Sequence, residues 1–128
     1  MIDSRLFFDT SAWLEYLLGL DDRMNEFFET SAILFTSVLS LYEIKKKLIQ
    51  MRLDHQRIKY LLNFIKTRSL VLDLNADLCE LAAELSITNH LHASDSLIYT
   101  SALSKNAKLI TYDSDFTKCS GVLVLERK

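Results

Sequence analysis

The sequence predicts an α/β protein, a three-layer α/β/α sandwich around a central, mostly parallel five-stranded sheet. Short apolar runs of strand length alternate along the chain with longer segments whose apolar residues recur at helical spacing. The short runs are apolar almost throughout, which is typical of parallel strands that are buried on both faces. The helical segments between them allow right-handed crossovers from one parallel strand to the next.

Five segments have the length and composition of buried strands. They are rich in Leu, Ile, Val and Phe, and Gly121 favours a turn before the last of them. The expected strands are Arg5–Asp9, Ala32–Thr36, Leu70–Leu74, Lys108–Thr111 and Val122–Leu125.

The segments between these strands are expected to be helical. Several begin at a residue whose side chain can cap a helix, such as Thr10 or Ser11 for the first helix and Ser37 for the third. Gly19 suits the C-terminal end of the first helix. The expected segments are Thr10–Gly19, Asp22–Ser31, Ser37–Leu53, His55–Arg68, Asn75–Thr88, His92–Ser104 and a turn or short helix over Ser114–Lys118.

The composition indicates one domain, expected over residues 1–128. The chain is 49% apolar, which is enough for a core. No apolar run is long enough for a membrane helix, and Asp3, Arg5 and Asp9 interrupt the apolar stretch that a signal peptide would need. We therefore expect a cytoplasmic protein that does not bind a membrane. Because there are only two glycines, a glycine-rich phosphate-binding loop is excluded.

Acidic residues stand at places where a parallel sheet would bring them together. Asp9 ends the first expected strand, and Asp113 lies two residues beyond the fourth. In open parallel sheets, ligands bind outside the carboxyl ends of the strands, where the strand order reverses. If these two strands are neighbours, Asp9 and Asp113 meet there. Glu43 and Asp95, each near the start of a helix, could reach the same place, and Asp115 competes with Asp113.

Each acid also has a purely structural interpretation. Asp9 could cap a helix, Asp95 could favour a helix start through the macrodipole, and Asp113 could form a turn. Glu43 could pair with a neighbouring lysine on a solvent-facing side. However, Glu43 shares a helix face with apolar residues, and a carboxylate on an inward face needs a partner. A metal ion is one such partner, and carboxylate oxygens favour Mg²⁺ or Mn²⁺ over zinc.

Four segments carry these acids in order: Phe8–Ala12 (FDTSA), Thr36–Ile44 (TSVLSLYEI), Ala93–Ile98 (ASDSLI) and Leu109–Phe116 (LITYDSDF). Together they resemble the motifs of the PIN domain family and, within it, the VapC-like toxins. The resemblance spans residues 8–116, nearly the whole chain. Serine stands directly before the third acid, where the family more often has alanine, but no carboxylate of the pattern is missing.

The resemblance implies a metal-dependent ribonuclease that hydrolyses RNA phosphodiester bonds with Mg²⁺ or Mn²⁺, as the toxin of a toxin–antitoxin pair. It also implies a homodimer and a small antitoxin protein as partner. The number of metal ions stays open. In this scheme the catalytic acids are Asp9, Glu43, Asp95 and Asp113; Asp9, Asp95 and Asp113 bind metal, Glu43 acts through water, and Ser11, Ser37, Thr111 and Asp115 support them.

Basic residues concentrate in one stretch of a chain whose net charge is −2. Since the whole molecule is not a polycation, it would need a local basic patch to bind nucleic acid. We expect this stretch to contact RNA phosphates, although it would also suit a solvated helix face. The residues are Lys45, Lys46, Lys47, Arg52, Arg57 and Lys59.

Two other functions fit parts of the pattern. A receiver-like phosphoacceptor signalling domain also places acids and Mg²⁺ at the carboxyl ends of a five-stranded sheet, with Asp73 as acceptor and Thr111 as the switch hydroxyl. Against it, Asp9 lacks a neighbouring second acid, and no lysine directly follows the last strand. The other alternative is a PIN domain that is not a toxin, either a nuclease of RNA processing or a non-catalytic scaffold.

Overall fold

A five-stranded sheet lies between two layers of helices in the computed structural model, which describes residues 4–127. All four strand pairings are parallel, and the strand order is β3-β2-β1-β4-β5. The predicted three-layer fold is therefore confirmed, and the sheet is parallel throughout. The strands are β1 (Arg5–Phe8), β2 (Ile33–Ser37), β3 (Leu70–Leu72), β4 (Lys108–Thr111) and β5 (Val122–Val124).

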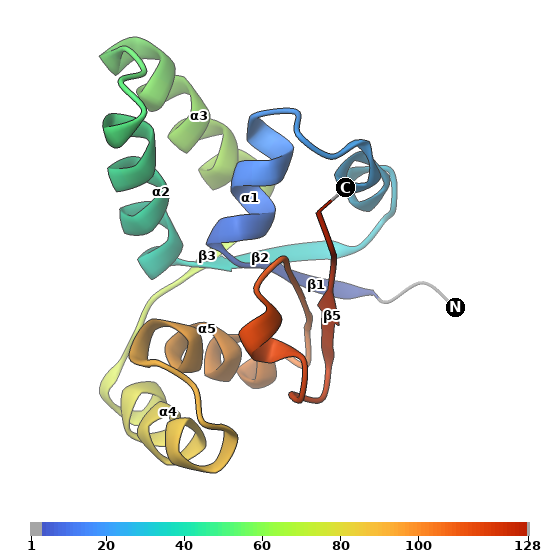
Figure 1. Cartoon of the computed structure of the whole chain (residues 1–128), viewed down its shortest axis with the longest axis vertical. Coiled ribbons are helices and arrows are strands. Elements are labelled where there is room, and N and C mark those ends of the chain that lie inside the picture. The colour runs from blue at the N-terminus through green and yellow to red at the C-terminus, as the bar shows by residue number, and fades with distance from the viewer. Residues whose placement is uncertain (1–3, 128) are drawn as a thin grey trace.

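Helices α1, α2 and α3 cover one face of the sheet, and α4 and α5 cover the other (Figure 1). The segment predicted over Asp22–Ser31 forms a shorter 3-10 helix, η1, and the Thr30 hydroxyl just beyond its end donates to the Phe27 carbonyl. The elements are α1 (Thr10–Leu17), η1 (Asp22–Phe28), α2 (Val38–Gln50), α3 (His55–Arg68), α4 (Ala76–Asn89), α5 (Ala93–Ser104) and η2 (Ser114–Phe116).

Strand β1 contributes to a core on each side of the sheet, because successive side chains of a strand point to opposite faces. Phe8 packs with Trp13 in the core beneath α1, α2 and α3. Phe7 belongs to the second core, beneath α5, together with Ile98. All four side chains are buried. This double burial explains why the strand reads as a continuous apolar run.

The strand order reverses between β1 and β4. The chain builds β2 and β3 on one side of β1 and then returns to place β4 and β5 on the other. Phe8 pairs with Ile110, and the Asp9 amide donates to the Ile110 carbonyl at 3.3 Å. The expected neighbouring of these strands is thus confirmed, and their carboxyl ends flank the crevice where ligands bind in such sheets.

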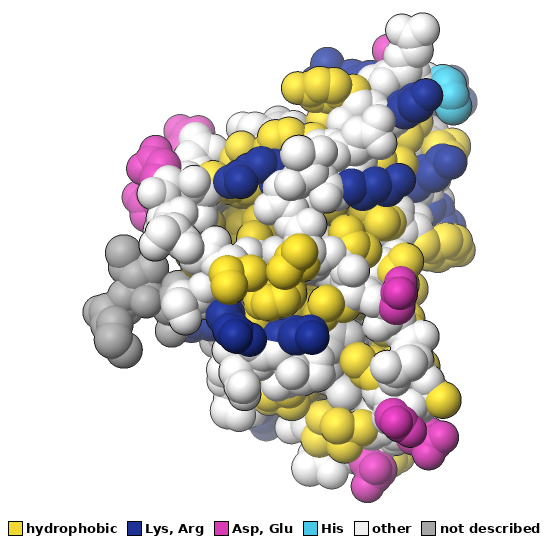
Figure 2. Space-filling view, turned by 180° about the vertical axis from the view of Figure 1, so that it is seen from behind, with side chains coloured by type: hydrophobic (Ala, Val, Ile, Leu, Met, Phe, Trp, Pro, Cys, Tyr) yellow, Lys and Arg dark blue, Asp and Glu magenta, His cyan; other side chains and the backbone are white. Residues whose placement is uncertain are grey.

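The opposite, amino-terminal ends of β3 and β2 carry exposed apolar side chains. Leu70 on β3 and Ile33 on β2 are 56% and 45% exposed. The rear face of the molecule shows apolar side chains gathered between basic ones (Figure 2).

Among residues 4–127, no helix combines the length and apolar character needed to span a membrane.

Candidate active site

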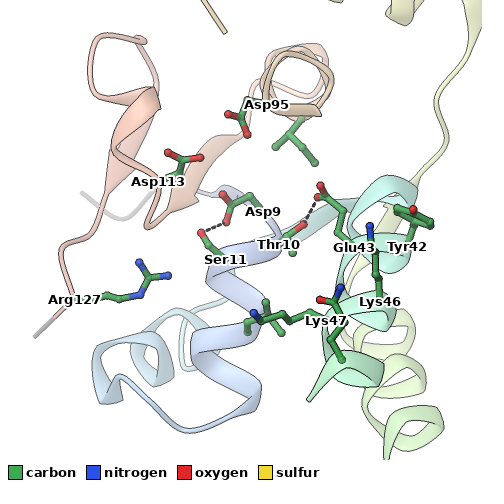
Figure 3. A pocket seen from close by; sticks show the side chains of 13 residues that line it. Asp9, Thr10, Ser11, Tyr42, Glu43, Lys46, Lys47, Asp95, Asp113 and Arg127 are labelled. Carbon is green, nitrogen blue, oxygen red and sulfur yellow. Dashed lines mark hydrogen bonds between the residues drawn. The ribbon is translucent and has the colours of Figure 1, made fainter. Parts of the chain in front are cut away.

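A pocket of about 480 Å³ opens beside the carboxyl ends of β1 and β4. It is lined by all four acids that the sequence predicts as catalytic. Asp9 directly precedes α1, Glu43 lies on α2, Asp95 lies on α5, and Asp113 lies in the loop after β4. Figure 3 shows their carboxylates turned toward a shared space. The lining residues are Asp9, Thr10, Ser11, Leu14, Tyr42, Glu43, Lys46, Lys47, Gln50, Asp95, Ile98, Asp113 and Arg127.

Asp9 is both a helix cap and a member of the pocket. Its Oδ1 accepts from the Ala12 amide at 2.9 Å and from the Ser11 hydroxyl at 2.7 Å, and its Oδ2 accepts from the Thr111 hydroxyl. The residue is only 7% exposed. Burial raises the pKa of Asp9 to about 6, against these hydrogen bonds, and Asp113 adds to the rise. The carboxylate is thus oriented but not fully compensated in charge.

Ser11 and Thr111 join Asp9 to the loop that carries Asp113. The Ser11 Oγ accepts from the Tyr112 amide at 2.9 Å, and the Thr111 Oγ1 accepts from the Asp113 amide at 3.0 Å. Each hydroxyl therefore contacts the Asp9 carboxylate and the backbone after β4 at once. Both residues were expected to support the site, and these contacts give them a positioning role.

Three carboxylates gather at the wall formed by α5 and the β4–η2 loop. Asp95, Asp113 and Asp115 each offer an oxygen, and these oxygens lie within 4.8 Å of one another. Burial raises the pKa of Asp95 to about 6, and the charges of Asp113, Asp115, Asp9 and Glu43 add to the rise. Asp115, which the sequence analysis named as a supporting residue, is thus part of this group of carboxylates.

Glu43 faces the pocket from the second turn of α2. The Thr10 hydroxyl donates to Glu43 Oε1 at 2.6 Å and lies 3.2 Å from the Ser40 hydroxyl (Figure 3). Thr10 therefore orients Glu43 toward Asp9. The sequence pointed to Thr10 only as a possible cap, although its position directly after Asp9 was a signal that it would reach the site.

The side of α2 that faces the pocket is set by helical spacing. Tyr42, Lys46 and Gln50 recur every four residues, and Glu43 and Lys47 form the adjacent row. Two of the six predicted RNA-binding residues, Lys46 and Lys47, thus line the pocket. Tyr42 and Gln50 were missed, although the same spacing from Lys46 would have found them.

The other four predicted basic residues lie outside this lining. Lys45 is part of a separate shallow groove on α2, and Arg52, Arg57 and Lys59 are exposed in the α2–α3 turn and on α3. Ser37 does not line the pocket either. Its hydroxyl accepts from the Leu39 amide at 3.1 Å, so it caps α2.

The donor set fits a hard divalent cation. The lining offers carboxylates and hydroxyls but, within residues 4–127, no histidine or cysteine. Oxygen ligands of this kind suit Mg²⁺ or Mn²⁺. Burial, and then the neighbouring carboxylates, raise the pKa values of Asp9 and Asp95 and so disfavour their charged forms. A bound dication would offset the negative charge of these carboxylates. Oxygens of Asp95 and Asp113 lie close enough to bind the same ion, and Asp9 lies beside them.

Fold and site together define an open parallel α/β domain with an acidic pocket where its strand order reverses. The family model of the PIN domain matches residues 6–122. The chain belongs to the PIN domain family, as the four sequence motifs suggested. A comparison with curated proteins found no match.

Solved structures share this fold at low sequence identity. A chain of a toxin–antitoxin complex from Klebsiella pneumoniae is 20% identical with a TM-score of 0.78, over 94% of this chain and 98% of that one. VapBC2 from Rickettsia felis, bound to a promoter DNA fragment, has 16% identity and a TM-score of 0.76, over 96% and 98%. VapC20 from Mycobacterium tuberculosis, a sarcin–ricin loop cleaving toxin, has 22% identity and a TM-score of 0.72, over 90% and 95%.

Proposed function

We propose that this chain is an endoribonuclease that depends on Mg²⁺ or Mn²⁺ and acts as a toxin. The observation that carries the proposal is the gathering of carboxylate oxygens of Asp95, Asp113 and Asp115 within 4.8 Å of one another. The buried Asp9 and the half-buried Glu43 lie beside them in the same pocket. Membership of the PIN family supports it, as does the likeness to a structure described as a toxin that cleaves the sarcin–ricin loop.

The acids have distinct roles in this proposal. A divalent ion held by Asp9, Asp95 and Asp113 would lower the pKa of water and offset charge on the phosphoryl group. Glu43 acts through a water molecule, and Thr10 keeps its carboxylate turned toward Asp9. Ser11 and Thr111 keep Asp9 in place through hydrogen bonds. Lys46 and Lys47 bind backbone phosphates of the RNA.

The partners follow from the same proposal. The similar structures include a toxin–antitoxin complex and VapBC assemblies, so we expect a small antitoxin protein and a homodimer. Tyr42 and Ile49 on α2, 63% and 55% exposed, offer apolar surface beside the pocket for one of these contacts. Light scattering after size exclusion measures the dimer, and a monomer at high concentration would contradict it.

Both cysteines are free thiols, which suits action in the cytoplasm.

The receiver-like alternative finds no support in the structure. Asp73, its acceptor candidate, follows the edge strand β3 and lines a different pocket, together with Asn75 and Asp77. A PIN nuclease of RNA processing would use the same acids as a toxin. Growth arrest on expression of the active chain, absent for Asp9→Asn, distinguishes a toxin from it.

The decisive experiment incubates purified protein with structured RNA, with and without Mg²⁺ or Mn²⁺. We expect cleavage only with metal, and none by Asp9→Asn. Asp77→Asn, which changes an exposed acid on α4 outside the pocket, is the matched control and should cleave normally. Cleavage in EDTA, or full activity of Asp9→Asn, would contradict the proposal.

A further inference from the structure

The residues after β5 return to the pocket. The Leu125 amide donates to the Thr111 carbonyl at 2.8 Å, which carries the chain past the end of β4. The next carbonyl, that of Glu126, accepts from the Arg23 guanidinium. Arg127 then lines the acidic pocket together with Asp9 and residues of α1, α2 and α5. Two hydrogen bonds between the backbone of this segment and distant parts of the chain thus bring this arginine to the site.

The Arg127 guanidinium is held on two sides. Its Nε donates to Glu15 Oε1 at 2.5 Å, and its Cζ lies over the Tyr112 ring, 5.5 Å from the ring centre. Glu15 is buried and stands four residues after Ser11, so both occupy the same side of α1. One helix face therefore positions Asp9 through Ser11 and Arg127 through Glu15.

This arrangement leaves the outer end of the guanidinium free to bind a ligand. Figure 3 shows it directed upward, toward the space beside Ser11 and Asp113, on the opposite side of the pocket from Lys46 and Lys47. The Arg127 side chain is 63% exposed. Its Nε serves Glu15, while the two Nη amino groups remain as paired donors, the geometry that matches two phosphate oxygens.

A purely structural role for the ion pair between Arg127 and Glu15 explains only part of this arrangement. A buried carboxylate such as Glu15 needs a cation or donors, and Arg127 supplies them. That need does not require the guanidinium to lie over the Tyr112 ring or to line the acidic pocket, where it lies near other carboxylates and yet pairs with Glu15. A cation prepared in this way suits an anionic ligand that enters the pocket.

We propose that Arg127 binds a backbone phosphate of the RNA substrate, on the side of the acids opposite Lys46 and Lys47. The inference rests on the proposed ribonuclease function and adds a substrate-binding residue that lies outside the four acidic motifs. The RNA would then be bound by lysines of α2 on one side and by Arg127 of the C-terminal segment on the other. Its scissile phosphate would lie between them, next to the acids.

The test uses the full chain and four variants. Arg127→Gln removes the charge, and Arg127→Lys keeps it without the paired donors. The double variant Glu15→Gln with Arg127→Gln removes the pair together, so that no buried carboxylate is left without its partner. Lys66→Gln, an exposed residue in the last turn of α3, is the control for loss of one positive charge. The readouts are kcat/KM for RNA cleavage, thermal stability and the salt dependence of RNA binding.

We expect Arg127→Gln and the double variant to lose about 10- to 100-fold in kcat/KM, the scale of a hydrogen bond to a charged group. Arg127→Lys should recover part of the loss, and Lys66→Gln should cleave normally. The double variant should melt close to the wild-type temperature. If it keeps wild-type kcat/KM, or if Arg127→Gln lowers only the melting temperature, the pair is structural and the inference is wrong.

RNA binding separates this inference from the ribonuclease proposal. Binding is measured with Mg²⁺ in the Asp9→Asn background, where turnover does not interfere. We expect Arg127→Gln to flatten the dependence of log K on log salt by about 0.7, the value for one phosphate contact on a single strand. An unchanged slope overturns the role of Arg127 even when the wild-type protein cleaves RNA. Absence of cleavage with a changed slope contradicts the ribonuclease proposal instead.

Discussion

At the scale of single residues, the site depends on side chains that serve the fold and the chemistry together. Asp9 caps α1 through the Ala12 amide while its carboxylate faces the pocket. The sequence offered capping and metal binding as alternatives, and the geometry is compatible with both at once. A substitution at this position must therefore be read through stability as well as activity.

Asp9→Asn should abolish activity without weakening the fold. Asparagine keeps an oxygen that can accept from Ala12, and it removes a charge that burial disfavours. We expect cleavage to fall by at least about 100-fold, since several kcal/mol of transition-state stabilisation depend on the metal. Thermal melting in EDTA should show an unchanged or higher midpoint. A clear loss of stability would mean that the cap requires the carboxylate itself.

Raised pKa values also predict how stability varies with pH. The pKa of Asp9 is raised by burial from 3.8 to about 6, so the folded protein holds this proton more tightly than the unfolded chain. In metal-free protein, the protonated Asp9 therefore stabilises the folded state. This stabilisation is complete below about pH 4 and is lost as the pH rises through about 6. This change corresponds to about 3 kcal/mol for Asp9, and Asp95 contributes in the same direction.

Denaturant unfolding in EDTA between pH 4.5 and 7.5 measures this effect. The double variant Asp9→Asn with Asp95→Asn should lose less stability over this range than the wild type. Equal slopes for the two proteins would show that these carboxyls do not carry raised pKa values.

At the scale of elements, helices α1 and α2 are joined where both begin. Thr10 in the first turn of α1 contacts Ser40 and Glu43 of α2. Helix boundaries and faces were largely predictable, because capping residues and apolar spacing are local features. The contact itself was not predictable, because it depends on how α1 and α2 pack.

Thr10→Val should lower cleavage by about tenfold, the scale typical of partners that orient a ligand. Valine has nearly the shape of threonine but cannot donate to Glu43, which leaves that carboxylate free to rotate. Thr10→Ser, which keeps the hydroxyl, is the matched control and should retain most of the activity. Steady-state cleavage of one RNA at saturating Mg²⁺ makes the comparison, and equal activity of both variants would remove Thr10 from the site.

We expect the lysines of α2 that line the pocket to be the ones that contact the substrate. Lys46→Gln and Lys47→Gln should each weaken RNA binding and lower its salt dependence by about 0.7 in log–log slope. Arg57→Gln and Lys59→Gln, on the exposed surface of α3, test the remainder of the predicted basic stretch. If they have the larger effect, the RNA path runs along α3 rather than across the pocket.

At the scale of the whole molecule, the sheet brings together acids that are far apart in sequence. Asp9, Glu43, Asp95 and Asp113 reach one pocket because parallel strands share a carboxyl edge and the order reverses between β1 and β4. That rule predicted the meeting of Asp9 and Asp113 from the sequence, whereas Glu43 and Asp95 were assigned to the site from their positions near helix starts and from the resemblance of the four motifs. The position of Arg127 was not predictable, because its link to Glu15 joins α1 to the end of the chain and leaves no local pattern.

Such a site should make the stability of the whole domain depend on metal. A ligand that binds only the folded state stabilises it by about 2.7 kcal/mol at a free concentration of 100 times its Kd, which corresponds to roughly 10 °C for a domain of this size. We expect Mg²⁺ or Mn²⁺ to raise the melting temperature and EDTA to reverse the rise. Asp95→Asn should reduce the shift, because its carboxylate lies within 4.8 Å of those of Asp113 and Asp115, whereas Asp77→Asn should preserve it. An equal shift in the wild type and in Asp95→Asn would mean that the ion binds elsewhere on the molecule, even if the protein cleaves RNA.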